Sequence, residues 1–595
     1  MFATSLRALG ALVVLSAGFL SACGGDLPNT AGSDVGAERR FTGGTAAIPI
    51  VELVRERGIE TPDQASPVPL LEQVRRQLAR SDPQSRWAGI TYDLTGGNRL
   101  PRDWLIQSPN RWSHSGADLP YYPLACKDCE PDLLLPTCES DADCPNGGTC
   151  QAVWPRPLAA MLAGRGAAAR KVCFGHSDAL LLPVHALVLK ARRFVDIGVL
   201  QPVPDARFLG TVRAALDELA VRGRAVQVRL LVGQYPPAGS DAAALLAALV
   251  GDLEHEPRGR LSISVAALRT CTTLEACNSF SWPHAKFIAV DGEEALVGGH
   301  NQWSEDYLVD APVHDLSMRV DGPAAMSATR FADRLWQFVC GHRAEAPAVQ
   351  LASFPRPAAG VAGPCPDHLA EPPGPRPAAG VPILAVGRMG AGIATDFANH
   401  SELARDLVLG SARRTIYLAQ QDLGFTLGRA APIYPESTLE RLVDFVVQRQ
   451  GELYIVLSNF GAVGNSGSSY SNSVSLATLA AHLREVAQRR AGRDVDDLLC
   501  RHVHLAPFRF GPDATWPGNR PIANHAKLWM VDERVFYLGS DNAYPVNLQE
   551  FGYVVDDRAA ARELVARYWK PLWQWARLAA VSGESVEPCV FAPVR

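Results

Sequence analysis

Two segments of the chain carry a histidine, a lysine and an aspartate in the same order and spacing. The first runs His284-Ala-Lys286-Phe-Ile-Ala-Val-Asp291 and, after six residues, Gly298-Gly299-His300-Asn301. The second runs His525-Ala-Lys527-Leu-Trp-Met-Val-Asp532 and, after six residues, Gly539-Ser540-Asp541-Asn542. Corresponding positions differ by 241 throughout. This constant offset indicates a duplicated unit.

The spacing within each segment predicts a binding and reaction site for phosphate. The apolar residues after each His-x-Lys predict a β-strand, in which residues i and i+2 face the same side. Imidazole can act as a nucleophile or exchange a proton near neutral pH, and an ammonium can bind a phosphoryl oxygen. The glycines permit close backbone approach, and the asparagine amide can orient a neighbouring group. Each aspartate falls near the strand end, where it can pair with a lysine or hold the turn.

The use of lysine supports this interpretation. Lysine occurs only at positions 127, 171, 190, 286, 527 and 570, and arginine supplies every other basic side chain. Arginine is a bulky planar fork, whereas lysine is a compact point charge. Because Lys286 and Lys527 fall at matching motif positions, the site is expected to need lysine there. Two copies then place two histidines, two lysines and two asparagines around one phosphate, in a set that requires no metal or other cofactor.

This pair of His-x-Lys-x4-Asp segments resembles the double motif of the phospholipase D superfamily. The likeness covers about residues 68–590, is interrupted by a cysteine-rich segment, and is closest to secreted actinomycete-type phospholipase D. The runs that carry it outside the motifs are Gly298–Tyr307, His314-Asp315-Leu316, Gln420-Gln421-Asp422, Gly461–Ser475 and Leu548–Tyr553.

The resemblance implies a two-step displacement at phosphorus. His284 would be the nucleophile and form a phosphatidyl-histidine. His525 would protonate the leaving alcohol and then activate water or another alcohol. Since the two histidines need opposite protonation states, activity should depend on pH with a bell-shaped profile.

The resemblance also implies supporting roles for the remaining motif residues. Asp315 and Glu550 match carboxylates that hydrogen-bond the two imidazoles and fix their tautomers. Phosphoryl oxygens would be bound by the two lysines together with Asn301 and Asn542. Asp291 and Asp532 complete the catalytic sets, and the backbone around the phosphate is supported by Gly298, Gly299, Gly539 and Ser540.

The order of helix and strand patterns predicts an α/β fold. A Pro/Ala/Gly-rich connector at 351–382 separates two stretches with the same alternation of amphipathic helix and β-rich run. The expected helices are 179–193, 208–221, 402–414 and 438–450, and the expected strands are 194–200, 226–232, 415–418 and 453–457. We therefore expect two pseudo-symmetric α/β/α sandwich halves, residues 67–350 and 383–595, with one active site at their interface.

The first residues predict export. Residues 1–22 contain Arg7 and an apolar run from Ala8 to Leu20, which is typical of a secretory signal peptide. Cys23 directly follows Leu-Ser-Ala and resembles the first residue of a mature bacterial lipoprotein; ordinary signal cleavage is the alternative. Residues 23–66 are polar and are expected to form a tether. We expect a protein anchored by lipid to the bacterial envelope, at the outer membrane, or secreted.

The cysteines favour disulfides in an oxidising compartment. Without Cys23, twelve of the 13 cysteines remain, an even number. Six crowd into an insertion at about 122–175, where a Cys-x-x-Cys pair leaves zinc or redox chemistry as an alternative: Cys126, Cys129, Cys138, Cys144, Cys150 and Cys173. Six cysteines permit 15 pairings, and the sequence assigns none. Cys340 and Cys365 are expected to pair across the start of the connector.

The net charge of the chain argues against a nucleic-acid substrate. The 595 residues carry 57 Lys+Arg against 62 Asp+Glu, a net charge of −5, whereas an enzyme that tracks nucleic acid normally has a basic excess. We expect a monomeric phospholipase D that acts at a membrane surface on phosphatidylcholine-like lipids, with water or a small alcohol as acceptor and no nucleic acid partner. The alternatives are a related nuclease, a cardiolipin synthase, which would usually bring membrane-spanning helices, and a non-catalytic binding lipoprotein on the same scaffold.

Overall fold

The computed structural model describes most of the chain beyond its first 49 residues. The described residues are 50–592 apart from 125–133, 154–157, 159–160, 163–170, 202, 236–238, 252–259, 273–280, 357–364, 367–378, 395, 427–430 and 472. The predicted signal peptide, Cys23, Cys126 and Cys129 lie outside the described residues, as does most of the connector.

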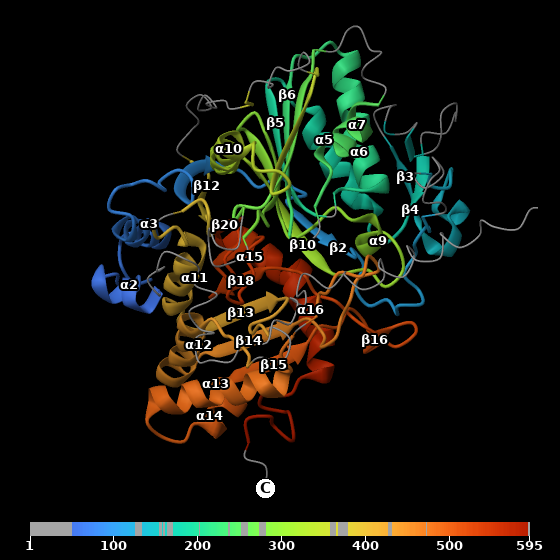
Figure 1. The fold of residues 1–595 in the computed structure, drawn as a ribbon. Helices are drawn as coiled ribbons and strands as arrows, with labels where there is room; N and C mark the ends of the chain where they lie inside the picture. Colours follow the sequence, from blue (N-terminus) through green and yellow to red (C-terminus); the bar gives the residue numbers. More distant parts are fainter. Residues whose placement is uncertain are drawn as a thin grey trace, which may run out of the picture.

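The first half is built on an eight-stranded mixed sheet, in the upper part of Figure 1. The strand order is β11-β7-β6-β5-β8-β9-β10-β2, in which β5, β6 and β7 are parallel and the other pairs antiparallel. The strands are β2 (Leu105–Ser108), β5 (Phe194–Leu200), β6 (Gln227–Gly233), β7 (Ser262–Leu268), β8 (Lys286–Val290), β9 (Glu294–Gly298), β10 (Asp315–Asp321) and β11 (Val349–Phe354).

Helices cover both faces of this sheet. α5 (Leu181–Leu189), α6 (Ala206–Val221) and α7 (Ala242–Val250) share one hydrophobic cluster, and α10 (Ala324–His342) belongs to another. Along β8 the side chains alternate between the two, since Ile288 lies in the α5 cluster and Phe287 in the α10 cluster. Strand β8 is therefore buried on both faces, which explains its unbroken apolar run.

The second half repeats this plan in the lower part of Figure 1. Its sheet has the order β1-β12-β20-β19-β18-β13-β14-β15, with β13, β14 and β15 parallel. The strands are β1 (Tyr92–Asn98), β12 (Val381–Arg388), β13 (Thr415–Gln420), β14 (Glu452–Leu457), β15 (Val503–Pro507), β18 (Leu528–Val531), β19 (Val535–Gly539) and β20 (Glu550–Asp556). The predicted α/β fold with two similar halves is confirmed.

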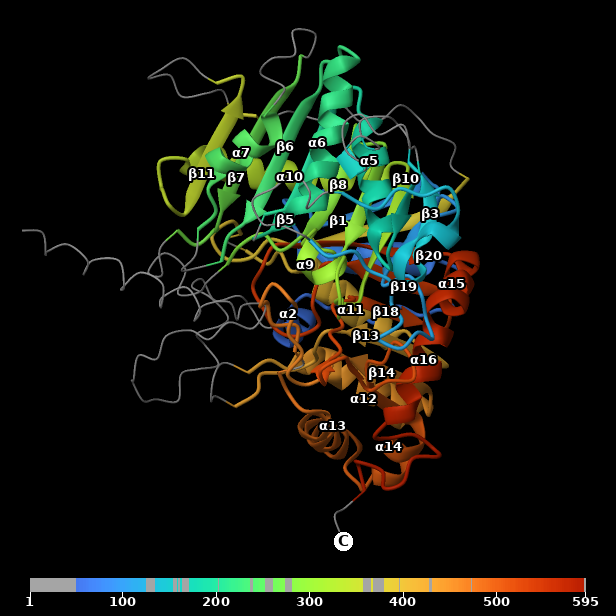
Figure 2. The same ribbon diagram turned by 90° about the vertical axis from the view of Figure 1, so that its right-hand side faces the viewer.

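The remaining elements lie around the two sheets, as Figure 2 shows from a second side. The helices are α2 (Ile50–Glu56), α3 (Leu70–Ser81), α9 (Ser304–Tyr307), α11 (His400–Gly410), α12 (Glu436–Arg449), α13 (Leu476–Ala491), α14 (Asp496–His502), α15 (Arg558–Leu564) and α16 (Lys570–Ala576). Two hairpins complete the fold, β3 (Thr149–Ala152) with β4 (Lys171–Phe174), and β16 (Thr515–Trp516) with β17 (Arg520–Pro521).

The structure corrects several predicted boundaries. The segment before β2 belongs to the second half, because β1 pairs with β12 and α3 packs against α11 and β12. The tether expected at 23–66 is too long, since α2 begins at Ile50 and buries Leu53. Strands β11 and β12 extend into the connector expected at 351–382. Chain position alone could not reveal these long-range pairings.

Disulfides hold the cysteine-rich insertion and both halves. Within the insertion Cys138 pairs with Cys150 and Cys144 with Cys173. The expected bond between Cys340 and Cys365 is present, and Cys500 pairs with Cys589. The three mutually close sulfurs of Cys138, Cys144 and Cys150 are therefore engaged as disulfides rather than as zinc ligands. Among the described residues, no helix is long and apolar enough to cross a membrane.

The two halves share one hydrophobic core. Phe331 of α10 packs against Phe287 of β8 and Phe551 of β20, with ring centroids 6.3 and 5.1 Å away. Phe287 and Phe551 are themselves 6.3 Å apart, and all three rings are almost fully buried. Aromatic packing thus fixes the motif strand of the first half against the second half.

Replacing Phe331 by alanine should destabilise the whole protein. The change leaves a cavity where both sheets meet, and a loss of about 3–5 kcal/mol in the free energy of unfolding is expected. Denaturant unfolding followed by circular dichroism measures it. Val221→Ala, at a side chain that is 54% exposed, is the control and should change little. If Phe331→Ala instead unfolded in two transitions and only one of them was shifted, the two halves would not share a core.

Candidate active site

The two motif histidines lie where the halves meet. Both histidines were expected on strands. The strands instead begin at Lys286 and Leu528, and each histidine lies in the segment just before its strand. There the backbone pairs with the opposite half. The amide of His284 donates to the carbonyl of Gln549 at 2.8 Å, and that of His525 to the carbonyl of His314 at 2.7 Å. Each histidine is thus positioned by both halves.

The two imidazoles face each other across this interface. Their ring centroids are 6.4 Å apart and their planes are nearly perpendicular, at 82°. A reacting atom lies roughly 3–3.5 Å from its partner before attack, so two such contacts together span a distance similar to the separation of the two rings. One phosphoryl group can therefore contact both rings.

Each imidazole is held by a carboxylate from the other half. His284 Nδ1 lies 2.8 Å from Glu550 Oε1 of β20, and His525 Nδ1 lies 2.8 Å from Asp315 Oδ2 of β10. A carboxylate at Nδ1 favours a proton on that nitrogen and leaves Nε2 free for chemistry. The longer glutamate thus reaches its histidine at the same distance as the aspartate.

The two carboxylates have different supports. Asp315 accepts hydrogen bonds from the Tyr307 hydroxyl and the Leu316 amide, both at 2.8 Å, and Glu550 accepts one from the Ser540 hydroxyl at 2.5 Å. Gly299 is the counterpart of Ser540. A Cβ at Gly299 would lie 2.0 Å from Asp315 Oδ1, so glycine makes room for that carboxylate.

The role of Tyr307 was not predicted. Its hydroxyl reaches Asp315 because the short helix α9 folds back over the site, which no sequence spacing indicates. Gly298 and Gly539 serve strand packing, since a Cβ would lie 2.4 Å from the Ser317 Cα and 2.6 Å from the Gly552 Cα, respectively.

The lysines and asparagines of the motifs are buried as well. Lys286 Nζ donates to the carbonyl of His284 at 2.6 Å, and Lys527 Nζ to that of His525 at 2.5 Å. The Asn301 and Asn542 amides donate to tyrosine hydroxyls, while the Oδ1 atoms of both have no hydrogen-bond partner within the described part of the chain. These buried amides therefore retain hydrogen-bonding capacity.

The two motif aspartates do not join the imidazole pair. Asp291 and Asp532 lie just past the far ends of β8 and β18, in left-handed backbone conformation. Asp291 accepts the backbone amides of Arg192, Arg193 and Phe194 at 2.8–2.9 Å. Asp532 binds residues 413–415 in the same way. Of the two roles considered for them, holding a turn is the one observed. Their turns also end the preceding helices, which were predicted to continue to 193 and 414.

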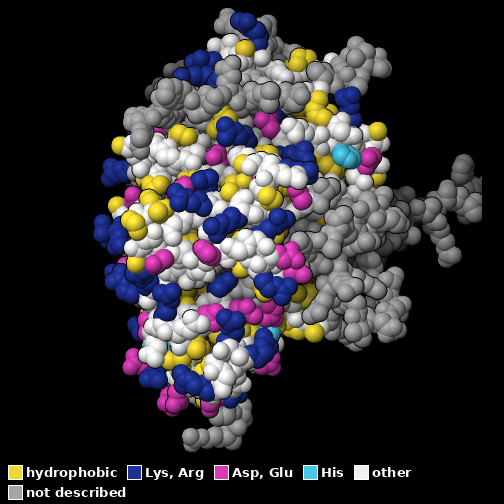
Figure 3. All heavy atoms as spheres, turned by 90° about the vertical axis from the view of Figure 1, so that its left-hand side faces the viewer, with side chains coloured by type: hydrophobic (Ala, Val, Ile, Leu, Met, Phe, Trp, Pro, Cys, Tyr) yellow, Lys and Arg dark blue, Asp and Glu magenta, His cyan; other side chains and the backbone are white. Residues whose placement is uncertain are grey.

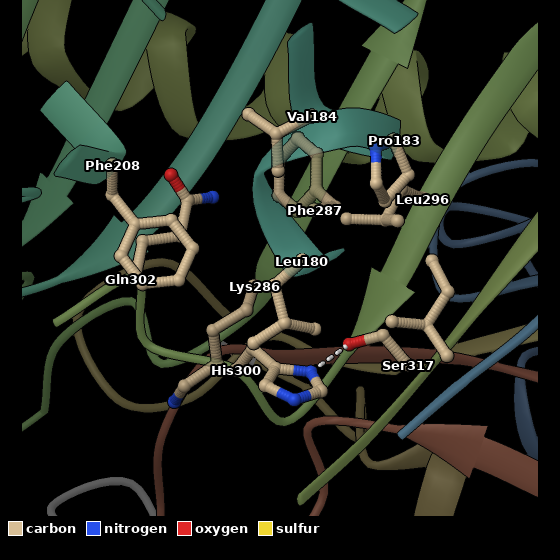
Figure 4. Close-up of a pocket in the computed structure, with 11 residues that line it drawn as sticks. Leu180, Pro183, Val184, Phe208, Lys286, Phe287, Leu296, His300, Gln302 and Ser317 are labelled. Carbon is tan, nitrogen blue, oxygen red and sulfur yellow. Dashed lines mark hydrogen bonds between the residues drawn. The ribbon is translucent and has the colours of Figure 1, made fainter. Parts of the chain in front are cut away.

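His300 has a structural role beside the site. Both of its ring nitrogens are engaged by serine hydroxyls, Nδ1 by Ser317 and Nε2 by Ser108. Figure 4 shows the Ser317 bond at the polar edge of a small cavity behind Lys286. The cavity volume of about 20 Å³ holds about one water molecule. Its lining residues are Ile106, Leu180, Pro183, Val184, Phe208, Lys286, Phe287, Leu296, His300, Gln302 and Ser317.

Burial and the two ammonium groups control protonation. Burial lowers the pKa of His284 and His525 well below 6.5, and Lys286 and Lys527 lower both further. Burial raises the pKa of Asp315 to about 7 and also raises that of Glu550. The free protein therefore favours neutral imidazoles. A bound phosphodiester would offset the ammonium charges and raise the imidazole pKa values.

The assembled site is covered in this conformation. His525 and Lys527 are fully buried, and His284 and Lys286 are 3% exposed. The Tyr470 ring stands edge-on to His525 at 4.8 Å, and its hydroxyl donates to Asp306 at 2.8 Å. The Tyr470 ring is thus one of the groups that cover the His525 imidazole in this conformation.

Comparison with known proteins decides the family. The chain is 30% identical over 567 residues to the phospholipase D of Streptomyces antibioticus, an alignment that covers 87% of this chain and 89% of that protein. The chain belongs to the phospholipase D family. Its paired imidazoles are accordingly those of a phosphodiester-processing enzyme. No protein-family model matches the chain.

Two solved structures align with part of this phospholipase D family member. A phosphatidylserine synthase of Haemophilus influenzae Rd KW20 aligns with a TM-score of 0.42 and 13% identity, over 68% of this chain and 84% of that one. A polyphosphate kinase from Porphyromonas gingivalis aligns with a TM-score of 0.34 and 12% identity, over 65% of this chain and 44% of that one.

The pH profile of kcat/KM should be bell-shaped and should respond to Tyr307. The low pKa of His284 keeps it neutral, so the acid limb should fall below pH 6.5, while the Asp315–His525 pair should set an alkaline limb near pH 7. The Tyr307 hydrogen bond lowers the pKa of Asp315. Tyr307→Phe should therefore raise that pKa, retain the proton to higher pH and move the alkaline limb upward.

The control is Tyr553→Phe, whose hydroxyl binds the carbonyl of Ala324 instead of a site carboxylate. It should leave the profile unchanged. An alkaline limb that stays in place or moves to lower pH in Tyr307→Phe would remove Tyr307 from the proton-holding network.

Proposed function

We propose that this protein is a phospholipase D that hydrolyses phosphatidylcholine-like glycerophospholipids to phosphatidic acid and the free headgroup alcohol. The observation that carries the proposal is the imidazole pair 6.4 Å apart, each ring held by a carboxylate of the opposite half. The relative from Streptomyces antibioticus is itself a phospholipase D.

In the first step His284 is the nucleophile. Its Nε2 lone pair attacks phosphorus while the bond from phosphorus to the headgroup oxygen breaks. That oxygen takes a proton from His525 Nε2, and a phosphatidyl-histidine forms on His284. Asp315 stabilises the protonated form of His525 before the transfer, and Glu550 orients the nucleophile.

In the second step the neutral His525 is the base. It removes a proton from water, whose oxygen attacks phosphorus as the bond to His284 Nε2 breaks and its electron pair returns to the imidazole. A small alcohol in place of water gives a transphosphatidylation product. Lys286 and Lys527 offset the charge on the phosphoryl oxygens, and Asn301 and Asn542 orient them. These steps need only side chains of the two motifs and their partners.

Surface charge favours a lipid substrate over nucleic acid. The net charge is −5, and acidic side chains lie among the basic ones on the face shown in Figure 3. A groove that follows a nucleic-acid backbone is usually dominated by positive charge. The acidic net charge therefore favours a small phosphodiester over a nucleic acid as the substrate.

The substrate assay offers purified protein phosphatidylcholine vesicles and single-stranded DNA in parallel, with EDTA present. Choline release without DNA cleavage is expected. His284→Ala should abolish turnover, since the nucleophile is lost, while His482→Ala, which changes a histidine paired with Glu436 outside the site, should retain it. DNA cleavage alone, or full activity of His284→Ala, would overturn the proposal.

A substrate whose leaving group departs without taking up a proton distinguishes the role of His284 from that of His525. With phosphatidyl-p-nitrophenol as substrate, His525→Ala should release one equivalent of nitrophenol in a burst and then stall. Mass spectrometry should find the phosphatidyl group on the peptide that contains His284. Steady turnover without an adduct would indicate direct attack by water.

We also propose that the mature protein is exported and anchored by lipid at Cys23. The apolar run and the Leu-Ser-Ala-Cys23 sequence support this location. Cys23→Ser should prevent incorporation of labelled palmitate in a bacterial host and leave unprocessed or released protein, whereas the parent chain should be labelled in the membrane fraction. Equal palmitate labelling of the Cys23→Ser variant and the parent chain would show that the lipid is attached at another residue.

A further inference from the structure

The two halves repeat an Ala-Arg-Arg turn, and in the second half a segment of the described chain covers it. Ala191-Arg192-Arg193 follows α5, and Ala412-Arg413-Arg414 follows α11. Asp291 holds the first turn through backbone amides, and Asp532 holds the second with the same pattern. The two turns are therefore equivalent corners of the duplicated fold.

In the second half the chain itself supplies an anion to this corner. The Arg413 guanidinium lies 2.7 Å from the Asp63 carboxylate, whose pKa is lowered by the Ala65 amide and by Arg413. The neighbouring Gln64 amide donates to Asp532 at 2.7 Å. The segment that precedes α3 thus covers the turn and places a carboxylate on its arginine.

In the first half the equivalent corner opens into a pocket of about 570 Å³. The lining includes a face of α5 and two residues of the cysteine-rich insertion, and the turns after α5 and α6 bring basic side chains to it. The volume is typical of a small-molecule site. The lining residues are Ala152, Leu158, Leu182, His185, Ala186, Leu189, Lys190, Ala191, Arg192, Arg222 and Arg224.

Two of the four basic side chains are already paired. Lys190 binds both carboxylate oxygens of Glu294, at 2.7 and 2.6 Å, and Arg222 binds Glu218 at 2.6 Å. Within the described part of the chain, neither Arg192 nor Arg224 has a carboxylate partner, and both are exposed. Two exposed guanidinium groups of the described chain are therefore available to an anionic ligand. A phosphomonoester carries about −1.5 to −2 charges at pH 7 and accepts bidentate bonds from arginine.

The rest of the pocket is suited to an apolar group. Leu182, Ala186 and Leu189 lie on one face of α5 at spacings of four and three residues. Beside them His185 is 1% exposed, and its Nε2 has no hydrogen-bond partner among the residues that the structure describes. Burial and the nearby Arg222 lower the pKa of His185 to about 4, so the ring is neutral and can bond an ester or hydroxyl oxygen. Inorganic phosphate would leave this wall uncovered.

We propose that this pocket is a second binding site, separate from the imidazole pair, for a lipid phosphomonoester. The phosphate binds Arg192 and Arg224 at the corner where β8 ends, and the glycerol and acyl groups lie along α5. Lys286 is at the opposite end of β8 from this corner. A lipid of this class is the product of the reaction proposed above, and only that link rests on the proposed function. The site would then retain the protein on membranes where product has accumulated.

Binding to the whole protein tests the site without turnover, because a phosphomonoester is not a diester substrate. Isothermal titration uses dihexanoyl phosphatidic acid below its micelle concentration. Arg192→Gln with Arg224→Gln should weaken binding at least tenfold. Ala186→Trp, which fills the pocket from an exposed position, should weaken it similarly. The matched control, Arg55→Gln in the last turn of α2 with Arg57→Gln just after that helix, removes the same charge and should bind as the parent does.

Further ligands separate the possible sources of the phosphate. Inorganic phosphate and glycerol 3-phosphate should bind at least tenfold more weakly than the lipid. Dihexanoyl phosphatidylcholine should not compete in the His284→Ala variant, which cannot convert it to phosphatidic acid. Equal affinity for glycerol 3-phosphate, or unchanged lipid binding in the Arg192/Arg224 variant, would overturn the proposal.

Activity is measured separately on monomeric dibutyryl phosphatidylcholine. The Arg192/Arg224 variant should hydrolyse it at the parent rate, since neither arginine lies at the imidazole pair. A parent protein that binds the phosphomonoester but releases no choline would refute the proposed function and leave this site standing. The reverse result would refute the site alone.

Discussion

The structure depends on two hydrogen bonds that cross between its halves, from His284 to Glu550 and from His525 to Asp315. Neither half contains both members of either of these two pairs. Because each pair is buried, its members would be costly to leave without their partners. The halves must therefore dock in one register for either histidine to be oriented, and the shared aromatic core around Phe331 supplies that register.

Duplication gives the site its symmetry, and the departures from symmetry give the two histidines different surroundings. One carboxylate is an aspartate supported by Tyr307, and the other is a glutamate supported by Ser540. Small changes in hydrogen bonding around similar pairs are sufficient to separate their pKa values. An acid and a nucleophile can thus arise from two copies of one motif.

Much of this arrangement could be predicted from the sequence, because it is local. The motif spacing, the buried strand after each His-x-Lys and the repeated order of helices and strands all follow from short-range patterns. The partners of Asp291 could not be chosen in advance, since a carboxylate near a strand end can bind a lysine or a turn. Tyr307 was missed because only the tertiary fold brings it to Asp315. The membership of β1 in the second sheet was missed for the same reason, since Tyr92 pairs with Val386.

That last pairing has a consequence for how the polypeptide is connected. From Ile50 the described chain lies first in the second half, passes through the first half and then returns, so the two sheets are joined by two crossings rather than one. A single proteolytic cut in the connector would leave the other crossing, between β1 and β2, intact. For this reason a cut in the proline-, alanine- and glycine-rich connector would not separate the two halves, and the enzyme should tolerate such a cut.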